Sequence, residues 1–90
     1  MKLSQRVKVR NDLGLHARPA TMIVKLLQGF CSQVTFTYKK DTINARSIMG
    51  ILMLAAKKNC ILTITAEGED AQDVIEKLTY AFESKFGEIV

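Results

Sequence analysis

The 90-residue chain is 48% hydrophobic and 24% charged, which indicates one globular domain over residues 1–90 and excludes a disordered chain or a second core. Its apolar runs, the longest at residues 51–56, are far shorter than the roughly 20 residues of a membrane span, and its start lacks the apolar region of a signal peptide, so we expect a cytoplasmic protein without membrane insertion. The net charge of +4 is spread over scattered basic groups without an aromatic ladder, so we expect no nucleic acid as a partner; acidic protein partners suit a mildly basic chain equally well.

The first half of the chain predicts a strand, a helix and a hairpin. Polar and apolar residues alternate over residues 6–10, which is typical of a half-buried strand. An amphipathic helix is predicted over residues 17–27, with Gly29 placed to end it in the left-handed conformation. Residues 34–38 and 42–44 predict paired strands, and the absence of glycine between them indicates a looser turn than the Asn-Gly type.

The second half predicts two helices that flank a strand. Ser47 can cap a short helix over residues 48–54, and we expect most apolar side chains of that helix to lie in the core. Asn59 tolerates the positive φ angle that could end this region, and residues 61–66 predict a fourth strand. The last helix begins near Asp70 and has an apolar face that extends to Phe86. The order βαββαβα favours an α+β fold in which three helices cover one face of a four-stranded antiparallel sheet.

The strongest candidates for functional residues lie together at residues 14–20, which hold the only histidine and the only proline of the chain. His16 falls at the amino-terminal edge of the predicted helix, where unpaired backbone N–H groups and the helix dipole favour an anion such as phosphate. Pro19 fits the first turn because no N–H is needed there, and Arg18 presents a planar donor fork to phosphoryl oxygens. From these residues alone, a capping histidine and a surface arginine are the simpler interpretation.

Three segments carry a family resemblance: GLHARPA at residues 14–20, NARSIMG at 44–50 and TAEGED at 65–70. They resemble, in the same order and spacing, the active-site signature, the regulatory-serine segment and the turn before the last helix of a known family. That family is the histidine-containing phosphocarrier proteins (HPr) of the bacterial phosphoenolpyruvate-dependent sugar phosphotransferase system. The resemblance implies an open-faced β-sandwich with the strand order 1-4-2-3.

For the site, the resemblance implies that Nδ1 of His16 accepts a phosphoryl group from phosphorylated Enzyme I. His16 would then pass the group to sugar-specific IIA proteins or domains. The backbone amides of Ala17 and Arg18, with the Arg18 guanidinium, would hold the oxygens of the transferred group. Such a chain is a monomeric phosphoryl carrier that needs no cofactor, and not a self-contained enzyme.

Ser47 and the helix that follows it have two interpretations each. Ser47 is a helix cap, but it also resembles the serine of the HPr subgroup that an ATP-dependent HPr kinase/phosphorylase regulates. Ile48 and Met49 belong to an apolar helix, yet so small a domain buries only one stripe, so we expect these two side chains to stay exposed near His16 as a docking patch. The predicted border of this patch is formed by Thr21, Gly50 and Met53.

The rival interpretation is an HPr-like regulatory module that docks a transcription regulator mainly through its Ser47-phosphorylated form. A small RNA-binding domain lacks a matching aromatic sequence, and a self-contained hydrolase lacks a trio of nucleophile, base and orienting group. One histidine and two distant cysteines, Cys31 and Cys60, predict no metal site and indicate reduced thiols rather than a disulfide.

Overall fold

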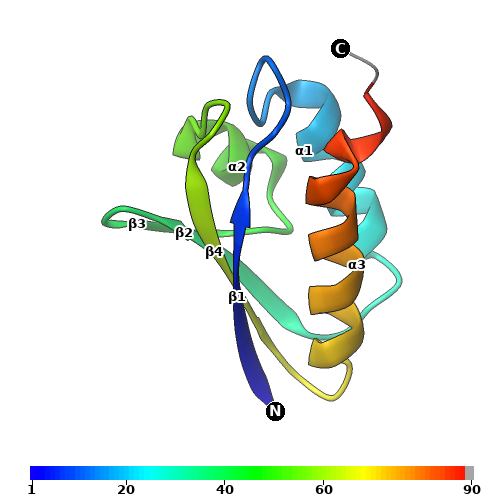
Figure 1. Cartoon of the computed structure of the whole chain (residues 1–90). Coiled ribbons are helices and arrows are strands. Elements are labelled where there is room, and N and C mark those ends of the chain that lie inside the picture. Colours follow the sequence, from blue (N-terminus) through cyan, green and yellow to red (C-terminus); the bar gives the residue numbers. More distant parts are fainter. Residues whose placement is uncertain (89–90) are drawn as a thin grey trace.

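The order of helices and strands is the predicted βαββαβα. The computed structural model describes residues 1–88, and its elements are, in chain order, β1 (Lys2–Lys8), α1 (Ala17–Leu27), β2 (Gln33–Tyr38), β3 (Asp41–Asn44), α2 (Ile48–Leu54), β4 (Ile61–Glu67), α3 (Ala71–Glu83) and the 3₁₀ turn η1 (Lys85–Gly87). The four strands form one antiparallel sheet in the order β1-β4-β2-β3, and the three α-helices cover one of its faces (Figure 1). The predicted open-faced β-sandwich is confirmed.

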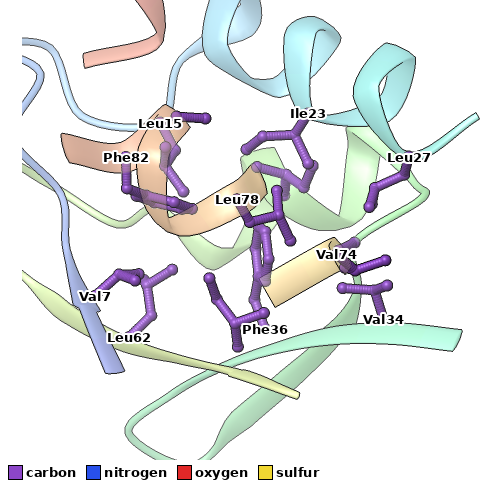
Figure 2. Packing of buried hydrophobic residues seen from close by; sticks show 14 of the residues in the cluster. Val7, Leu15, Ile23, Leu27, Val34, Phe36, Leu62, Val74, Leu78 and Phe82 are labelled. Atoms are coloured by element: carbon purple, nitrogen blue, oxygen red, sulfur yellow. The ribbon is translucent and has the colours of Figure 1, made fainter. Parts of the chain in front are cut away.

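Alternating side chains give the sheet its apolar face. In β4, Leu62, Ile64 and Ala66 are buried, whereas the residues between them are at least partly exposed. Helices α1 and α3 contribute buried side chains to the same cluster (Figure 2). Phe36 of β2 meets Phe82 of α3 edge to face, with ring centroids 5.8 Å apart. Because full burial of one such side chain is worth about 1.5–3 kcal/mol, contact between sheet and helices stabilises both layers.

The first strand begins earlier than predicted. Alternation placed it at residues 6–10, but pairing along the whole of β4 holds residues 2–8 in the sheet. Val9 follows the strand and remains buried, and its carbonyl accepts a hydrogen bond from the N–H of Asn59 at 2.7 Å. Asn59 has the predicted positive φ, at 77°. The bounds of β1 are therefore set by a distant partner strand and not by the local pattern.

The connection between β2 and β3 is tighter than predicted. Tyr38 pairs with Asp41, so only two residues form the turn, and the first of them, Lys39, has a φ of 56°. The hydroxyl groups of Thr37 and Thr42 hydrogen-bond across the hairpin at 2.8 Å. The expectation of a loose turn was wrong, because a lysine here adopts the positive φ that such turns need.

Helix α1 ends without a left-handed glycine. Gln28 keeps right-handed helical angles, and Gly29 is not among the residues with positive φ. The carbonyl of Leu27 instead accepts hydrogen bonds from the N–H of Phe30 at 3.1 Å and from Nη1 of Arg46 at 2.8 Å. The prediction for Gly29 was wrong. The Arg46 side chain donates to the Leu27 carbonyl, so this end of the helix does not need the hydrogen bond that a left-handed glycine cap provides.

Helix α3 begins directly after Asp70, as predicted. The Asp70 carboxylate does not cap its own helix but accepts hydrogen bonds from the N–H groups of Cys31 at 2.8 Å and Ser32 at 3.0 Å. It also accepts a bond from the Ser32 hydroxyl, which is the main reason that the pKa of Asp70 falls from 3.8 to about 2. The start of α3 is thereby joined to the segment before β2.

The chain reverses after α3. The helix ends at Glu83, and Lys85 and Phe86 both have positive φ angles, 57° and 54°. Phe86 was predicted on the apolar face of the helix; it lies instead in η1, where it is buried with its ring centroid 4.9 Å from that of Phe82. Within residues 1–88, no helix combines the length and the apolar character needed to traverse a bilayer.

Candidate functional site

His16 lies at the N-cap position of α1, as the sequence predicts. Its backbone is extended, with φ −80° and ψ −168°, and its carbonyl accepts the N–H of Ala20 at 3.1 Å. The imidazole makes no capping hydrogen bond, and its side chain is 32% exposed. The ring is therefore accessible to solvent at the start of a helix.

The loop before His16 packs against the segment that follows α2. Gly14 has a φ of 69°, and a Cβ atom at this position would lie 2.3 Å from the carbonyl oxygen of Ala56. The N–H of the buried Leu15 donates to that same oxygen at 3.0 Å. Since a side chain at residue 14 would clash with the Ala56 carbonyl, only glycine allows the two backbone segments to come this close.

The first turn of α1 offers hydrogen-bond donors to an anion. The N–H groups of Ala17 and Arg18 precede the first N–H that bonds within the helix, and both residues are exposed. Pro19 has no N–H to leave unpaired, and no acidic residue lies in this turn. Neither of the two ion pairs within residues 1–88 involves Arg18. Two amides and one guanidinium are therefore able to bind oxygens of a group next to His16.

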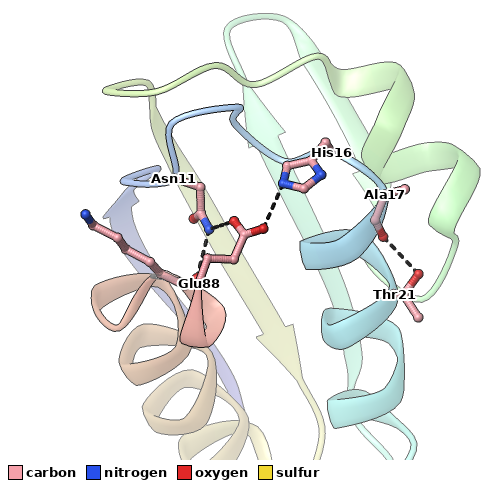
Figure 3. A network of polar contacts seen from close by, with 6 residues as sticks. Asn11, His16, Ala17, Thr21 and Glu88 are labelled. Carbon is pink, nitrogen blue, oxygen red and sulfur yellow. Dashed lines mark hydrogen bonds and ion pairs between the residues drawn. The ribbon is translucent and has the colours of Figure 1, made fainter. Parts of the chain in front are cut away.

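The imidazole has a carboxylate partner that local sequence patterns do not predict (Figure 3). Nε2 of His16 lies 3.0 Å from Oε2 of Glu88. The side-chain nitrogen of Asn11 donates to the other carboxylate oxygen and, at 2.8 Å, to the carbonyl of Lys85. Asn11 is fully buried, and the Glu88 side chain is only 12% exposed. The second ring nitrogen, Nδ1, lies on the side of the imidazole away from Glu88.

Ser47 caps α2, as predicted. Its Oγ accepts the N–H of Gly50 at 3.0 Å, and the residue is half-buried. The preceding Arg46 donates three hydrogen bonds, each 2.8 Å long, to the carbonyls of Leu27, Phe30 and Ser32. The serine is therefore partly accessible at a helix start, while its basic neighbour is engaged with backbone.

Four apolar side chains of α2 are exposed, and we call them the α2 patch: Ile48 (39%), Met49 (67%), Leu52 (38%) and Met53 (75%). Only Ile51 and Leu54 of this helix are buried. The predicted exposure of Ile48 and Met49 is confirmed, whereas the expectation that most of the helix lies in the core was wrong. A helix of seven residues that packs beside α1 reaches the core along one side only.

The predicted border residues lie on the two helices that adjoin the site. Thr21 is on α1, half-buried, with its hydroxyl donating to the carbonyl of Ala17 at 2.9 Å (Figure 3). Gly50 is half-buried in the first turn of α2. Because α1 and α2 pack against each other, Thr21 and the α2 patch occupy adjoining helices.

Outside the surroundings of His16, the described residues include one further ion pair and two free cysteines. Asp12 accepts a hydrogen bond from Nζ of Lys58 at 2.7 Å, and this bond and the lysine charge hold the pKa of Asp12 below its usual 3.8. Both thiols are free: Cys31 is exposed, and the half-buried Cys60 donates to the Tyr38 hydroxyl at 3.3 Å. Within the described residues, no three His, Cys, Asp or Glu side chains are grouped so as to hold a metal ion.

Known proteins resemble this chain over nearly its whole length. Residues 3–84 match the family model described as the PTS HPr component phosphorylation site. The phosphocarrier protein HPr of Chlamydia muridarum is 47% identical over 88 residues, which cover 98% of this chain and 85% of that protein. The crystal structure of HPr-C-His from Thermoanaerobacter tengcongensis gives a TM-score of 0.92 at 36% identity and covers 98% of this chain and 99% of the other. Crh, a catabolite repression protein of Bacillus subtilis solved as a dimer with a swapped domain, gives a TM-score of 0.76 at 38% identity over 90% of this chain and 93% of its own.

Proposed function

The chain belongs to the HPr family of phosphocarrier proteins of the phosphotransferase system, and we propose that His16 is its phosphorylation site. In this proposal, residues 1–90 act as one monomeric cytoplasmic domain. Nδ1 of His16 accepts the phosphoryl group from phosphorylated Enzyme I and passes it to a sugar-specific IIA protein or domain. The observation that carries the proposal is a solvent-accessible imidazole at the start of α1, beside unpaired helix amides.

The transfer needs positioning and charge neutralisation more than it needs chemistry from this chain. A bond forms between Nδ1 and phosphorus as the bond from phosphorus to the donor breaks, and the donor keeps that electron pair. The amides of Ala17 and Arg18 and the Arg18 guanidinium face the oxygens of the incoming group. These contacts are few and solvent-exposed, which suits a carrier that must also release its phosphoryl group.

Incubation with phosphoenolpyruvate and Enzyme I, followed by intact-mass measurement, tests the proposal. We expect wild type to gain one acid-labile phosphoryl group and His16→Ala to gain none. Ser47→Ala is the matched control, because it removes the other candidate acceptor and should be labelled as wild type is. Acid-labile label that persists on His16→Ala would refute the assignment.

Arg18→Lys tests the role of the guanidinium. Lysine keeps the positive charge but cannot form two parallel hydrogen bonds to one phosphoryl group, so transfer from Enzyme I should slow while the fold is retained. The measurement is the rate of phosphoryl transfer, with circular dichroism as the check on folding. Equal rates for the two proteins would remove Arg18 from the mechanism.

We propose that Enzyme I and the IIA acceptor dock on the α2 patch. Exposed methionines adapt to more than one partner surface, and the patch lies on the helix that adjoins α1. Met49→Asp should weaken binding of Enzyme I, measured by titration calorimetry. Tyr80→Asp on α3 is the control, since Tyr80 is 73% exposed, is apolar in large part and lies outside the patch. Equal binding by Met49→Asp and wild type would show that the patch is not the docking surface.

A second proposed function is regulation through Ser47, supported by its half-buried hydroxyl at a helix start and by the similarity to Crh. Phosphate at the N-cap of α2 would be compatible with the helix dipole, so an HPr kinase/phosphorylase could modify the folded protein and create a form that binds a transcription regulator. Treatment with such a kinase should label wild type but not Ser47→Ala. An unlabelled wild type would argue against regulation at this residue.

A further inference from the structure

The proton on the imidazole decides which nitrogen of His16 can act as a nucleophile. A neutral histidine carries one proton, and only the nitrogen without it has a free lone pair. Nε2 lies 3.0 Å from a Glu88 oxygen, and an ionised carboxylate can only accept a hydrogen bond. Nε2 must therefore donate in this contact, which leaves the lone pair on Nδ1.

Glu88 is itself held in place. Its second oxygen accepts a hydrogen bond from the buried Asn11, whose side-chain nitrogen also bonds the carbonyl of Lys85 at 2.8 Å. The N–H of Glu88 donates to that same Lys85 carbonyl at 2.9 Å. Phe86, buried against Phe82, anchors the reversal that brings the segment back to α1. The carboxylate thus reaches His16 from a folded turn and from a nearly buried position.

Asn11 acts in this network through its side-chain nitrogen. Oδ1 of Asn11 is buried and has no hydrogen-bond partner within the described residues. The side-chain nitrogen, however, fixes both the Glu88 carboxylate and the turn that carries it.

We infer that Glu88, held by Asn11, is a positioning residue for phosphoryl transfer. The inference rests on the proposed role of His16. Glu88 keeps the proton on Nε2 and orients the ring so that Nδ1 is the nucleophile. When Nδ1 bonds to phosphorus the ring becomes cationic, because the Nε2 proton stays in place, and the adjacent carboxylate stabilises that charge. No proton moves in the step, and the bond from phosphorus to the donor is the one that breaks.

Nitrogen NMR of the His16 ring tests the inference without any phosphoryl donor. At a pH where the ring is neutral, wild type should show a protonated Nε2, an unprotonated Nδ1 and a slowly exchanging Nε2 proton. Glu88→Ala should show faster exchange of that proton and a mixture of the two tautomers. Glu83→Gln on α3 removes an exposed carboxylate that does not contact His16, and its ring signals should match wild type.

The rate of phosphoryl transfer from Enzyme I provides the second measurement. Loss of one charge-assisted hydrogen bond should slow transfer to Glu88→Ala about tenfold, with Glu88→Gln in between and Glu83→Gln unchanged. Unaltered ring signals together with an unaltered rate in Glu88→Ala would overturn the inference and leave the role of His16 intact. A wild type that takes up no phosphoryl group would instead contradict the proposed function, while the NMR comparison still decides whether Glu88 fixes the tautomer.

Discussion

Arg46 should be one of the most important single side chains for the stability of this fold. Its guanidinium donates three hydrogen bonds of 2.8 Å to backbone carbonyls between the end of α1 and the start of β2. At about 1 kcal/mol net for each bond, replacement by methionine, which keeps the aliphatic stem, should lower the free energy of unfolding by about 3 kcal/mol. The carbonyl of Leu27 keeps a second donor, the N–H of Phe30, so the loss should not greatly exceed this value.

Urea denaturation followed by circular dichroism measures the effect. Arg46→Met should lower the midpoint of unfolding without changing the slope, because the loss of these bonds does not change the surface exposed on unfolding. The midpoint of Arg46→Lys should lie between those of wild type and Arg46→Met. An ammonium group cannot reach three carbonyls in the planar geometry of a guanidinium. Lys40→Met, in the exposed β2–β3 turn, controls for the loss of one positive charge. A loss of less than about 1 kcal/mol in Arg46→Met would refute this reasoning about the bonds.

Three further predictions concern the start of α3, the loop before His16 and the start of α2. The pKa of Asp70 is lowered to about 2 in the folded chain, so its stabilising contribution should be complete above about pH 4 and be lost as the pH falls toward 2. Denaturation midpoints measured between these pH values should show this loss in wild type, and Asp70→Asn should abolish the part of the pH dependence that Asp70 causes. Gly14→Ala should lower the free energy of unfolding by about 2 kcal/mol or more, because it adds a strained backbone angle and a clash with the Ala56 carbonyl, and an unchanged melting temperature would contradict this. Ser47→Ala should cost about 1 kcal/mol through loss of the α2 cap, and a smaller change than about 0.3 kcal/mol in urea denaturation would show that the cap is unimportant.

Local patterns were sufficient to predict the order of elements and several of their ends. The N-cap positions of His16 and Ser47 and the positive φ of Asn59 follow from neighbouring residues, and all three are present. Each of these features depends on interactions within about one helical turn or one loop, which is the range that residue preferences describe. The arrangement of donors around His16 could be anticipated for the same reason.

The features that were not predicted depend on residues far apart in the chain. Glu88 meets His16 across 72 residues, and this contact requires the reversal after α3, which no nearby periodicity indicates. Arg46 acts 19 residues away on the carbonyl of Leu27 and so removes the need for a left-handed Gly29. In the second case a long-range side-chain contact takes the place of the local preference for a left-handed glycine at a helix end.

One backbone oxygen joins the segment that carries the imidazole to the segment that follows the helix with the exposed methionines. The carbonyl of Ala56 leaves no room for a side chain at Gly14 and accepts the N–H of Leu15, so the two segments are held together by a direct backbone contact. In the docking proposed for the α2 patch, a partner meets a surface whose two segments are already in contact, so productive collision requires correct orientation of the two proteins.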